Sequence, residues 1–517
     1  MFTEIKGLTE ECGVFGIWGH KEAASLAYIG LHTLQHRGQE GAGIVVKKED
    51  EKGNSCLHQH RGLGLAAEIF SKDTLEGLRG TAAIGHVRYT TSGGRNEIAN
   101  VQPFLFRFAE SSFSLAHNGN IINAETLKKE LEQSGSIFQS SSDTELLAHL
   151  ITRSKKDTLK EKVKEALNIV KGGFAFVIFT ENELIAALDT NGFRPLSIGK
   201  IVPAAGVIES ENINSSYSNT NNIKNISYVV ASETCVFDTI GAEFVRDVCP
   251  GEIIIINDNG ITIEKYNEDT NLAVCAMEFI YFARPDSNIY GVNVHTARKE
   301  MGKTLAKETQ ALSENLNITP LIFSGANSNS ADLVIGVPDS GISSAIGYSE
   351  FAGIPYELGL IKNRYVGRTF IQPSKELREQ GVRMKLSAVR SIVEGKKVVV
   401  IDDSIVRGIT SKRIVKLLRE AGALEVHFKV ASPPLIYPCF YGIDIQTTRE
   451  LIAFENSVNQ IREFISADSL QFLSLEGMIN SINLPVEGKY KGLCVAYFNG
   501  DYPTGLYDYQ KELQKII

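Results

Sequence analysis

The run KKVVVIDDSIVRGITSKR, residues 396–413, constrains the fold of this chain more than any other segment. Val398–Ile401 predict a short buried strand, Asp402 and Asp403 follow at its carboxyl end, and Gly408 lies in the loop before a predicted helix. Ligands bind at the carboxyl ends of strands in open parallel sheets. Strand-like runs such as DLVIGVP alternate with helical ones such as SKRIVKLLREAGA. The last third therefore predicts a parallel α/β domain with a ligand site at the two aspartates.

The loop after the two aspartates is suited to a dianionic phosphate. Backbone N–H groups at a helix N-terminus bind anions, and Thr410 and Ser411 add hydroxyl donors. Adjacent carboxylates suit ribose hydroxyls and Mg²⁺. Paired aspartates at a strand end could instead form a solvated turn. The order of strand, two acids, glycine and hydroxyl loop, and helix favours the ligand site.

Two further segments fit a highly charged ligand. Gly336–Gly341 (GVPDSG) follows an apolar strand and offers the Ser340 hydroxyl and backbone donors to a pyrophosphate and Mg²⁺. The second segment is rich in glycine and cations, which predicts a lid that closes over the site and excludes water, although a solvated basic face is the alternative. Its cations are Lys362, Arg364, Arg368, Arg383 and Lys385.

The first third of the chain alternates apolar segments with glycine-rich turns, as in CGVFGIWG, TAAIGHVRYTTSGG and FSLAHNGN. This alternation of apolar segments and glycine-rich turns predicts a β-rich layered domain. A predicted helix over residues 143–155 interrupts it, with Ser142 and Glu145 at the spacing of a capping box. The strand-like run that ends near residue 265 predicts a domain boundary at residues 265–275.

Cys12 is the candidate nucleophile of this first domain. It lies in EECGVFG, directly after two glutamates. A lone cysteine is usually a small buried hydrophobic residue. An N-terminal cysteine, however, can supply its own base, because a free α-amino group has a pKa near ~8. That chemistry requires removal of Met1–Glu11 as a propeptide.

Other residues supply the groups that amide hydrolysis by a thiol needs. Asn118 and Gly119 in HNGN could donate to a developing oxyanion. Arg88 could clamp an α-carboxylate, Asp143 could pair with an α-ammonium, and Arg37 lies on a glycine-rich turn. Each has a plainer reading: a hairpin turn, a surface charge or a helix cap.

Composition limits the classes of function. The chain has 517 residues, which predicts two or three domains, and its net charge of -8 gives no support for a nucleic-acid partner. Seven cysteines without a secretory signal indicate a reducing, cytoplasmic setting. No apolar run approaches the roughly 18 residues that a membrane span needs.

Taken together, these motifs resemble known families. The front set resembles the N-terminal-nucleophile glutaminase domain of class II amidotransferases, and residues 402–411 resemble the phosphoribosylpyrophosphate (PRPP) fingerprint of type I phosphoribosyltransferases. A glutaminase ahead of a PRPP-binding domain resembles the glutamine PRPP amidotransferases over nearly the whole chain, with GHVRYTTSGG, NGFRPLSIG and KNRYVGRTFIQP among the matching runs.

The resemblance implies a fold, a reaction and a set of site residues. The fold is an αββα sandwich over residues 12–268, a parallel α/β domain over 269–470 and a C-terminal extension over 471–517. Glutamine, PRPP and water give 5-phosphoribosylamine, pyrophosphate and glutamate, the first committed step of de novo purine synthesis. Family members form homotetramers and are inhibited by purine nucleotides.

The implied roles divide the site residues into three groups. Cys12 is the nucleophile, with Arg37 close to it. Asn118 and Gly119 stabilise the tetrahedral intermediate, while Arg88 and Asp143 hold the amino-acid end of glutamine. One Mg²⁺ per subunit is expected at Ser340, Asp402 and Asp403. The residues expected to bind PRPP are Asp402, Asp403, Ser404, Val406, Arg407, Gly408, Thr410, Ser411, Lys362, Arg364 and Lys385.

One position departs from the family pattern. Some members hold a [4Fe–4S] cluster through four cysteines, and three of those positions match Cys275, Cys439 and Cys494. The fourth is Tyr497, whereas four thiolates are the normal requirement. Two readings stay open: a cluster held by three thiolates with a tyrosinate or water, and a site that has lost its cluster.

Two rival functions also remain. A class II amidotransferase with another acceptor, such as a sugar phosphate, would use a phosphate loop other than DDSIVRG. A PRPP-sensing regulatory protein with vestigial catalysis would not need the glutaminase set.

Overall fold

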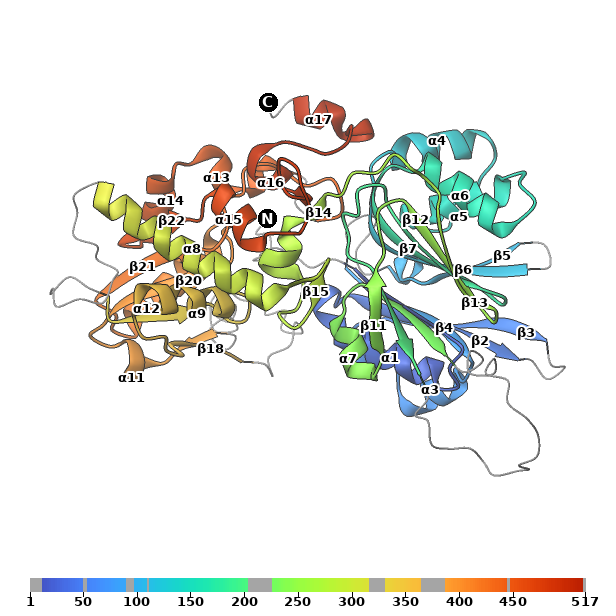
Figure 1. The fold of residues 1–517 in the computed structure, drawn as a ribbon, viewed down its shortest axis with the longest axis horizontal. Coiled ribbons are helices and arrows are strands. Elements are labelled where there is room, and N and C mark those ends of the chain that lie inside the picture. The colour runs from blue at the N-terminus through green and yellow to red at the C-terminus, as the bar shows by residue number, and fades with distance from the viewer. Residues whose placement is uncertain are drawn as a thin grey trace.

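The computed structural model describes residues 12–49, 54–89, 97–108, 111–202, 226–315, 331–363, 386–443 and 447–514. Two halves lie side by side: the earlier part of the chain forms one and the later part forms the other (Figure 1). The N-terminal half is built on two β-sheets, and the C-terminal half is built on a parallel sheet with helices.

Two antiparallel sheets face each other in the N-terminal half. Strand β1 (Gly13–Trp18) shows why they do. Its Phe15 and Ile17 face an outer core with helices, while Val14 and Trp18 face the core between the sheets. The first sheet has the order β11–β9–β10–β1–β4–β2–β3 and the second β13–β12–β8–β7–β6–β5.

The remaining strands of the first sheet are β2 (Gly41–Glu49), β3 (Ser55–Leu63), β4 (Ala82–Arg88), β9 (Ser197–Ile201), β10 (Ser227–Ala231) and β11 (Glu243–Asp247). Those of the second are β5 (Phe104–Phe108), β6 (Ser111–Ile121), β7 (Gly172–Thr180), β8 (Leu184–Leu188), β12 (Glu252–Asn257) and β13 (Gly260–Lys265).

Helices cover the outer face of each sheet, so the half is an αββα sandwich, as the family resemblance implied. The first sheet is covered by α1 (Ala23–Thr33), α2 (Ala66–Ile69), α3 (Lys72–Gly77) and α7 (Cys235–Ile240). The second is covered by α4 (Ala124–Gln133), α5 (Thr144–Arg153) and α6 (Leu159–Ile169).

The predicted capping box of α5 is wrong. Asp143 occupies the N-cap position without a side-chain cap bond. The Glu145 carboxylate instead accepts from the backbone N–H groups of Gln139 and Ser140, both at 2.8 Å. The loop that precedes the helix competes for this side chain and holds it.

The C-terminal half is a parallel sheet of order β17–β20–β21–β22 with helices on both faces, which confirms the parallel α/β prediction. In β20, Val399 and Ile401 join the core of α8, α9 and α15, whereas Val398 and Val400 join that of α12 and α14. The strands are β17 (Leu333–Gly336), β20 (Lys397–Asp402), β21 (Glu425–Val430) and β22 (Ser469–Phe472). The helices are α8 (Val294–Asn315), α9 (Gly341–Ala352), α15 (Leu475–Ile482), α11 (Arg390–Val393), α12 (Ile409–Glu420), α13 (Ile452–Glu455) and α14 (Val458–Ile465).

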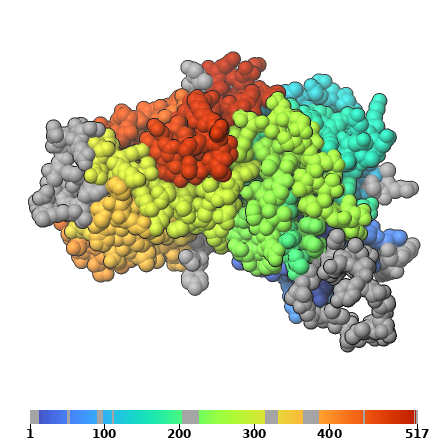
Figure 2. Space-filling model, in the orientation of Figure 1, coloured from blue at the N-terminus to red at the C-terminus, as the bar shows by residue number. Residues whose placement is uncertain are grey.

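The end of the chain ties the two halves together. Strand β23 (Leu493–Cys494) pairs in parallel with β14 (Val274–Cys275) of the C-terminal half, whereas the Asp508 carboxylate reaches the N-terminal half and accepts from the Glu125 N–H at the start of α4 at 2.8 Å. The C-terminal residues lie against both halves at their junction (Figure 2). Smaller elements here are β18 (Leu360–Lys362), β19 (Leu386–Ala388), α16 (Ala496–Asn499) and α17 (Gln510–Gln514). Among the described residues, no helix has the length and apolar character needed to cross a membrane.

Candidate active sites

A small cavity beside Cys12 brings together residues that are far apart in the sequence. Cys12 stands directly before β1, Arg88 ends β4, Gly119 lies in β6 and Asp143 precedes α5. All four line the cavity, which is completed by Tyr89, Gln102, His117 and Ser142. The structure thus gathers the predicted nucleophile, one oxyanion donor and both predicted glutamine ligands around one space.

The Cys12 thiol is buried, with 5% of the residue exposed. Its Sγ donates to the Tyr89 carbonyl at 3.3 Å and accepts from the Tyr89 N–H at 3.5 Å. Burial raises the pKa of the thiol to about 11, although the Tyr89 bond and the Arg88 charge act in the opposite direction. The thiol is therefore protonated at neutral pH and needs a base before it can attack.

Asn118 and Gly119 have the features of an oxyanion hole. Gly119 has φ +144, and a Cβ there would lie 2.0 Å from the Gly173 carbonyl oxygen, so only glycine fits. Asn118 is fully buried, and neither atom of its side-chain amide has a hydrogen-bond partner within the described ranges. Buried amides are normally paired, so this amide stays a candidate oxyanion donor, although Asn118, unlike Gly119, is not among the residues that line the cavity.

Arg88 and Asp143 supply one charge of each sign to the cavity. Arg88 is 3% exposed, and its Nη1 lies 4.0 Å from a Glu40 carboxylate oxygen. The Asp143 carboxylate accepts from the Ile121 N–H at 2.8 Å and lies 3.7 Å from His117 Nδ1. A cation and an anion in one cavity match the zwitterionic end of a free amino acid.

Arg37 is buried, not a surface charge, and it contacts the backbone of the nucleophile. Its Nε donates to the Cys12 carbonyl at 3.2 Å, and the residue is 1% exposed. It also forms ion pairs with Glu233 and Glu278, whose side chains are both fully buried. The sequence argument missed these two acids. The available signal was a carboxylate inside an apolar run, as in AMEFIYF.

The second site lies at the carboxyl end of β20, where the motif predicted it. Asp402 is the last residue of the strand, and both it and Asp403 are buried. Ser340, at the start of α9, donates to Asp403, and the Ser404 hydroxyl donates to the other Asp403 oxygen at 2.5 Å. Burial first, and repulsion from Asp403 second, raise the pKa of Asp402, and burial also raises that of Asp403.

The loop from Ser404 to the start of α12 directly follows this carboxylate pair in the chain. Gly408 is the N-cap of α12 with φ +71, and Ser411 is buried in the first turn while Thr410 is exposed. Val406 is buried, and Arg407 pairs with Glu450 at 2.5 Å. The backbone N–H groups at the start of this helix are thus available to an anion.

The predicted lid is only partly described. Lys362, at the end of β18, forms an ion pair with Asp339 of the GVPDSG loop at 2.9 Å. Arg364, Arg368, Arg383 and Lys385 lie outside the described residues, and so does the expected propeptide at residues 1–11.

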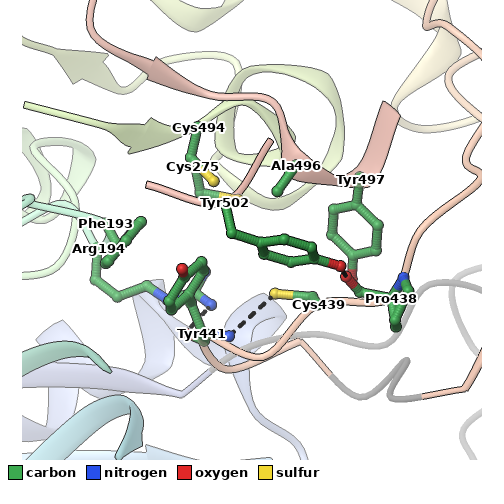
Figure 3. A pocket seen from close by; sticks show the side chains of 10 residues that line it. All are labelled: Phe193, Arg194, Cys275, Pro438, Cys439, Tyr441, Cys494, Ala496, Tyr497 and Tyr502. Atoms are coloured by element: carbon green, nitrogen blue, oxygen red, sulfur yellow. Dashed lines mark hydrogen bonds between the residues drawn. The ribbon is translucent and has the colours of Figure 1, made fainter. Parts of the chain in front are cut away.

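The three cysteines of the possible cluster position share one small cavity at the junction of the halves (Figure 3). Cys275 and Cys494 are register partners on β14 and β23, and the Cys439 sulfur accepts from the Tyr441 N–H at 3.3 Å. The remaining lining is mainly aromatic and includes Phe193, Tyr441, Tyr497 and Tyr502. Phe193 and Tyr441 stack at 4.1 Å between ring centroids.

This cavity disfavours charged sulfur. Burial raises the pKa of Cys494 to about 12, and it raises the pKa of the Tyr441 and Tyr502 phenols well above the ordinary value. The Tyr502 ring is drawn between the Cys275–Cys494 pair and Cys439 (Figure 3). Within the described residues, no three His, Cys, Asp or Glu side chains are grouped so that they could hold a metal ion.

Comparisons with known proteins match both halves. Residues 88–211 match a glutamine amidotransferase domain family, and residues 311–432 match a phosphoribosyl transferase domain family. An amidophosphoribosyltransferase of Bacillus subtilis is 56% identical over 98% of this chain and 97% of its own. One of Staphylococcus aureus is 52% identical over 98% of this chain and 93% of its own.

Two solved structures agree with these relatives. The glutamine PRPP amidotransferase from B. subtilis, complexed with ADP and GMP, superposes with a TM-score of 0.82 at 54% identity, covering 96% of this chain and 98% of that one. A structure described as the allosteric regulatory enzyme of purine biosynthesis gives 0.84 at 55% identity, covering 96% and 97%. With this identity over nearly its whole length, and with a glutaminase-type cavity and a phosphoribosyltransferase-type site in one fold, the chain belongs to the amidophosphoribosyltransferase family.

Proposed function

We propose that this chain transfers ammonia from glutamine to PRPP and forms 5-phosphoribosylamine, pyrophosphate and glutamate, the first committed step of purine synthesis. The observation that carries the proposal is the presence of two complementary sites in one chain: the Cys12 cavity and the Asp402–Asp403 site. One releases ammonia from an amino acid, and the other binds a phosphorylated sugar.

The first reaction takes place at Cys12. After removal of Met1–Glu11, the free α-amino group of Cys12 takes the thiol proton, which the raised pKa makes necessary. The thiolate attacks the glutamine amide carbon, while Arg88 and Asp143 hold the amino-acid end. Asn118 and Gly119 donate to the oxyanion of the tetrahedral intermediate. The α-ammonium returns its proton to the departing nitrogen, the C–N bond breaks and ammonia leaves, and water then hydrolyses the thioester to glutamate.

In the second reaction, beside β20, ammonia attacks the sugar C1 of PRPP, the bond from C1 to the pyrophosphate oxygen breaks, and the new amine loses a proton. Backbone N–H groups and hydroxyls from Ser404 to Ser411 bind the sugar phosphate. The family resemblance assigns the pyrophosphate to the cations Lys362, Arg364 and Lys385. The buried carboxylates Asp402 and Asp403, whose pKa values are raised, fit a divalent cation together with Ser340. A bound Mg²⁺ would neutralise charge on the departing pyrophosphate.

The residues around Cys275, Cys439 and Cys494 do not fit a [4Fe–4S] cluster. Tyr497 stands where a fourth thiolate would be needed, so the cavity offers only three thiols, whereas such clusters normally require four thiolates. We therefore propose a cavity filled by packed side chains that joins the two halves, and no step of the reaction passes through it.

Three further expectations come from the family resemblance. Purine nucleotides inhibit the enzyme, in keeping with the ADP and GMP bound in the B. subtilis structure. Association into a homotetramer and a cytoplasmic location remain predictions.

One assay tests the proposed reaction against its rivals. Purified protein should release glutamate from glutamine, and pyrophosphate from PRPP, in equal amounts and only when both substrates are present. Cys12→Ala should lose this activity and still use PRPP with free ammonia. Glutaminase activity that ignores PRPP would point to another acceptor. PRPP binding without pyrophosphate release would point to a regulatory protein with vestigial catalysis.

A further inference from the structure

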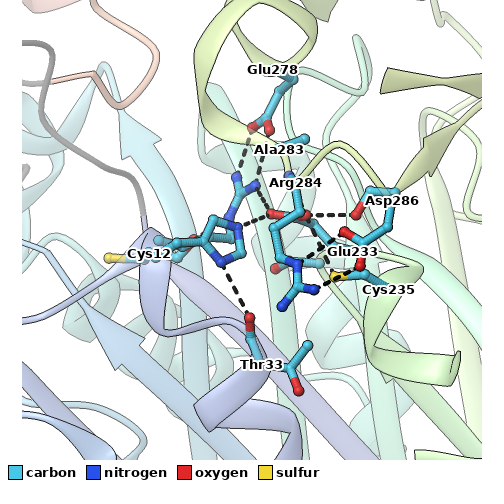
Figure 4. A network of polar contacts seen from close by, with 12 residues as sticks. Cys12, Thr33, Glu233, Cys235, Glu278, Ala283, Arg284 and Asp286 are labelled. Carbon is cyan, nitrogen blue, oxygen red and sulfur yellow. Dashed lines mark hydrogen bonds and ion pairs between the residues drawn. The ribbon is translucent and has the colours of Figure 1, made fainter. Parts of the chain in front are cut away.

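A cluster of buried charges lies at the junction of the two halves, beside Cys12 (Figure 4). The Arg37 guanidinium sits between two carboxylates, Glu233 from the N-terminal half and Glu278 from the C-terminal half. All three side chains have no exposed surface. Taking charges out of water is expensive, so such a cluster persists only with good geometry and complete pairing.

Glu278 holds the plane of the guanidinium. Arg37 Nη1 donates to Glu278 Oε2 at 2.9 Å, and Nη2 donates to Oε1 at 2.7 Å. Two parallel bonds of this kind fix the orientation of an arginine as well as its position. With the guanidinium held in this orientation, Arg37 Nε donates a hydrogen bond to the Cys12 carbonyl at 3.2 Å.

The Glu233 carboxylate also contacts several groups other than Arg37. It accepts from the Ser287 hydroxyl at 2.7 Å and from the Arg284 N–H at 2.9 Å, and it contacts His36 at 2.6 Å. Burial raises the pKa of Glu233, but His36, Arg37 and the Ser287 hydroxyl together hold it well below its usual value. Glu278, in contrast, accepts from Arg37 through both of its carboxylate oxygens, and Arg194 Nη1 lies 3.8 Å from Glu278 Oε1.

The backbone that carries Glu278 is itself fixed. Glu278 begins the π-helical turn η4 (Glu278–Phe282), and such turns are frequent at functional sites. Arg298 of α8 donates to the Phe279 carbonyl at 2.7 Å and to the Ala283 carbonyl at 2.8 Å. The carboxylate is thus presented to Arg37 from a rigid part of the phosphoribosyltransferase half.

We propose that Glu278 is a positioning residue for the glutaminase nucleophile and acts on it through Arg37. By orienting Arg37, it holds the Cys12 carbonyl, and with it the α-amino group and thiol of the same residue. The inference rests on the proposed role of Cys12. It implies that the nucleophile is correctly placed only when the C-terminal half is docked.

Glu278→Gln tests this role, because it keeps the size of the side chain and removes the charge. Glutamine-dependent and ammonia-dependent synthesis of phosphoribosylamine are measured on the full-length protein, whose mature N-terminus is checked by intact mass. Glu252→Gln is the matched control: Glu252 is also buried and paired with an arginine, Arg246, and it accepts from the Cys249 N–H at 2.8 Å.

For Glu278→Gln we expect kcat with glutamine to fall about tenfold or more, the effect of losing a charge-assisted hydrogen bond. The KM for glutamine and the ammonia-dependent kcat should stay within about twofold of wild type, because Arg37 touches the nucleophile and not the substrate. The control should change neither activity. If the protein does not fold, Glu278→Asp, which keeps the charge with a shorter reach, should show the same split between kcat and KM.

Two results would overturn the inference. One is an unchanged glutamine-dependent kcat in Glu278→Gln. The other is an equal loss of both activities, which would assign Glu278 to docking the halves alone. Failure of the proposed function looks different, because wild-type protein would then lack glutamine-dependent synthesis altogether.

Discussion

Replacement of Asn118 by alanine separates activity from stability in this protein. The Asn118 amide is fully buried and has no hydrogen-bond partner within the described ranges, so its removal breaks no bond of the resting protein. An unpaired buried amide destabilises a fold by about 1–3 kcal/mol, so its removal should stabilise the protein. The cavity that alanine leaves destabilises the protein and acts in the opposite direction. The free energy of unfolding should therefore change by only about 1 kcal/mol.

The effect on catalysis should be much larger. Loss of one oxyanion donor lowers kcat about 100- to 1000-fold. The drop should appear in glutamate release and in glutamine-dependent synthesis. Ammonia-dependent synthesis should be unchanged, since it does not use the Cys12 cavity.

Asn120→Ala is the matched control on the same strand. Asn120 donates to the Phe440 carbonyl at 2.9 Å, so its loss leaves a buried acceptor unpaired and should lower the thermal midpoint. Its kcat with glutamine should change much less than that of Asn118→Ala. The reasoning is refuted if Asn118→Ala keeps its glutamine-dependent kcat within about threefold of wild type.

Three other measurements follow from the geometry. Burial lowers the pKa of Lys429 from 10.5 to about 7. Between these pH values the unfolded chain binds a proton that the folded protein lacks, so the stability of the wild-type protein should rise with pH. Lys429→Met should raise the thermal midpoint at pH 7 and make stability less dependent on pH in this range. Gly442→Ala would place a Cβ 3.1 Å from the Gly119 backbone, so it should lower the glutamine-dependent kcat but not the ammonia-dependent kcat. Gly488→Ala is the control and should lower neither, because Gly488 has the same φ of +121 but no atom near the position of a Cβ. Anaerobically purified protein should lack stoichiometric iron and acid-labile sulfide, and Tyr497→Cys, which restores a fourth thiol, serves as the comparison.

Local sequence was enough wherever a site is built from neighbouring residues. The acceptor motif is of this kind: its strand, carboxylates, Gly408 and helix start are contiguous, so their order already fixes their arrangement in space. Gly119 differs, because HNGN suggested a turn, whereas Gly119 lies inside strand β6, where its φ of +144 and the nearby Gly173 carbonyl require glycine. The capping box at Ser142 and Glu145 failed because a neighbouring loop offered the glutamate better donors than the helix did.

By itself, the sequence determined the two domain types and predicted a candidate nucleophile and a candidate phosphate loop, because these depend on residue type and local spacing. Only the tertiary structure decided which charges surround Cys12. Arg37 and Glu278 belong to different halves and meet only when the halves dock. A carboxylate in an apolar run signals a buried partner but does not identify it. That pairing depends on how the sandwich and the parallel sheet pack, since burial requires each charge to find its opposite.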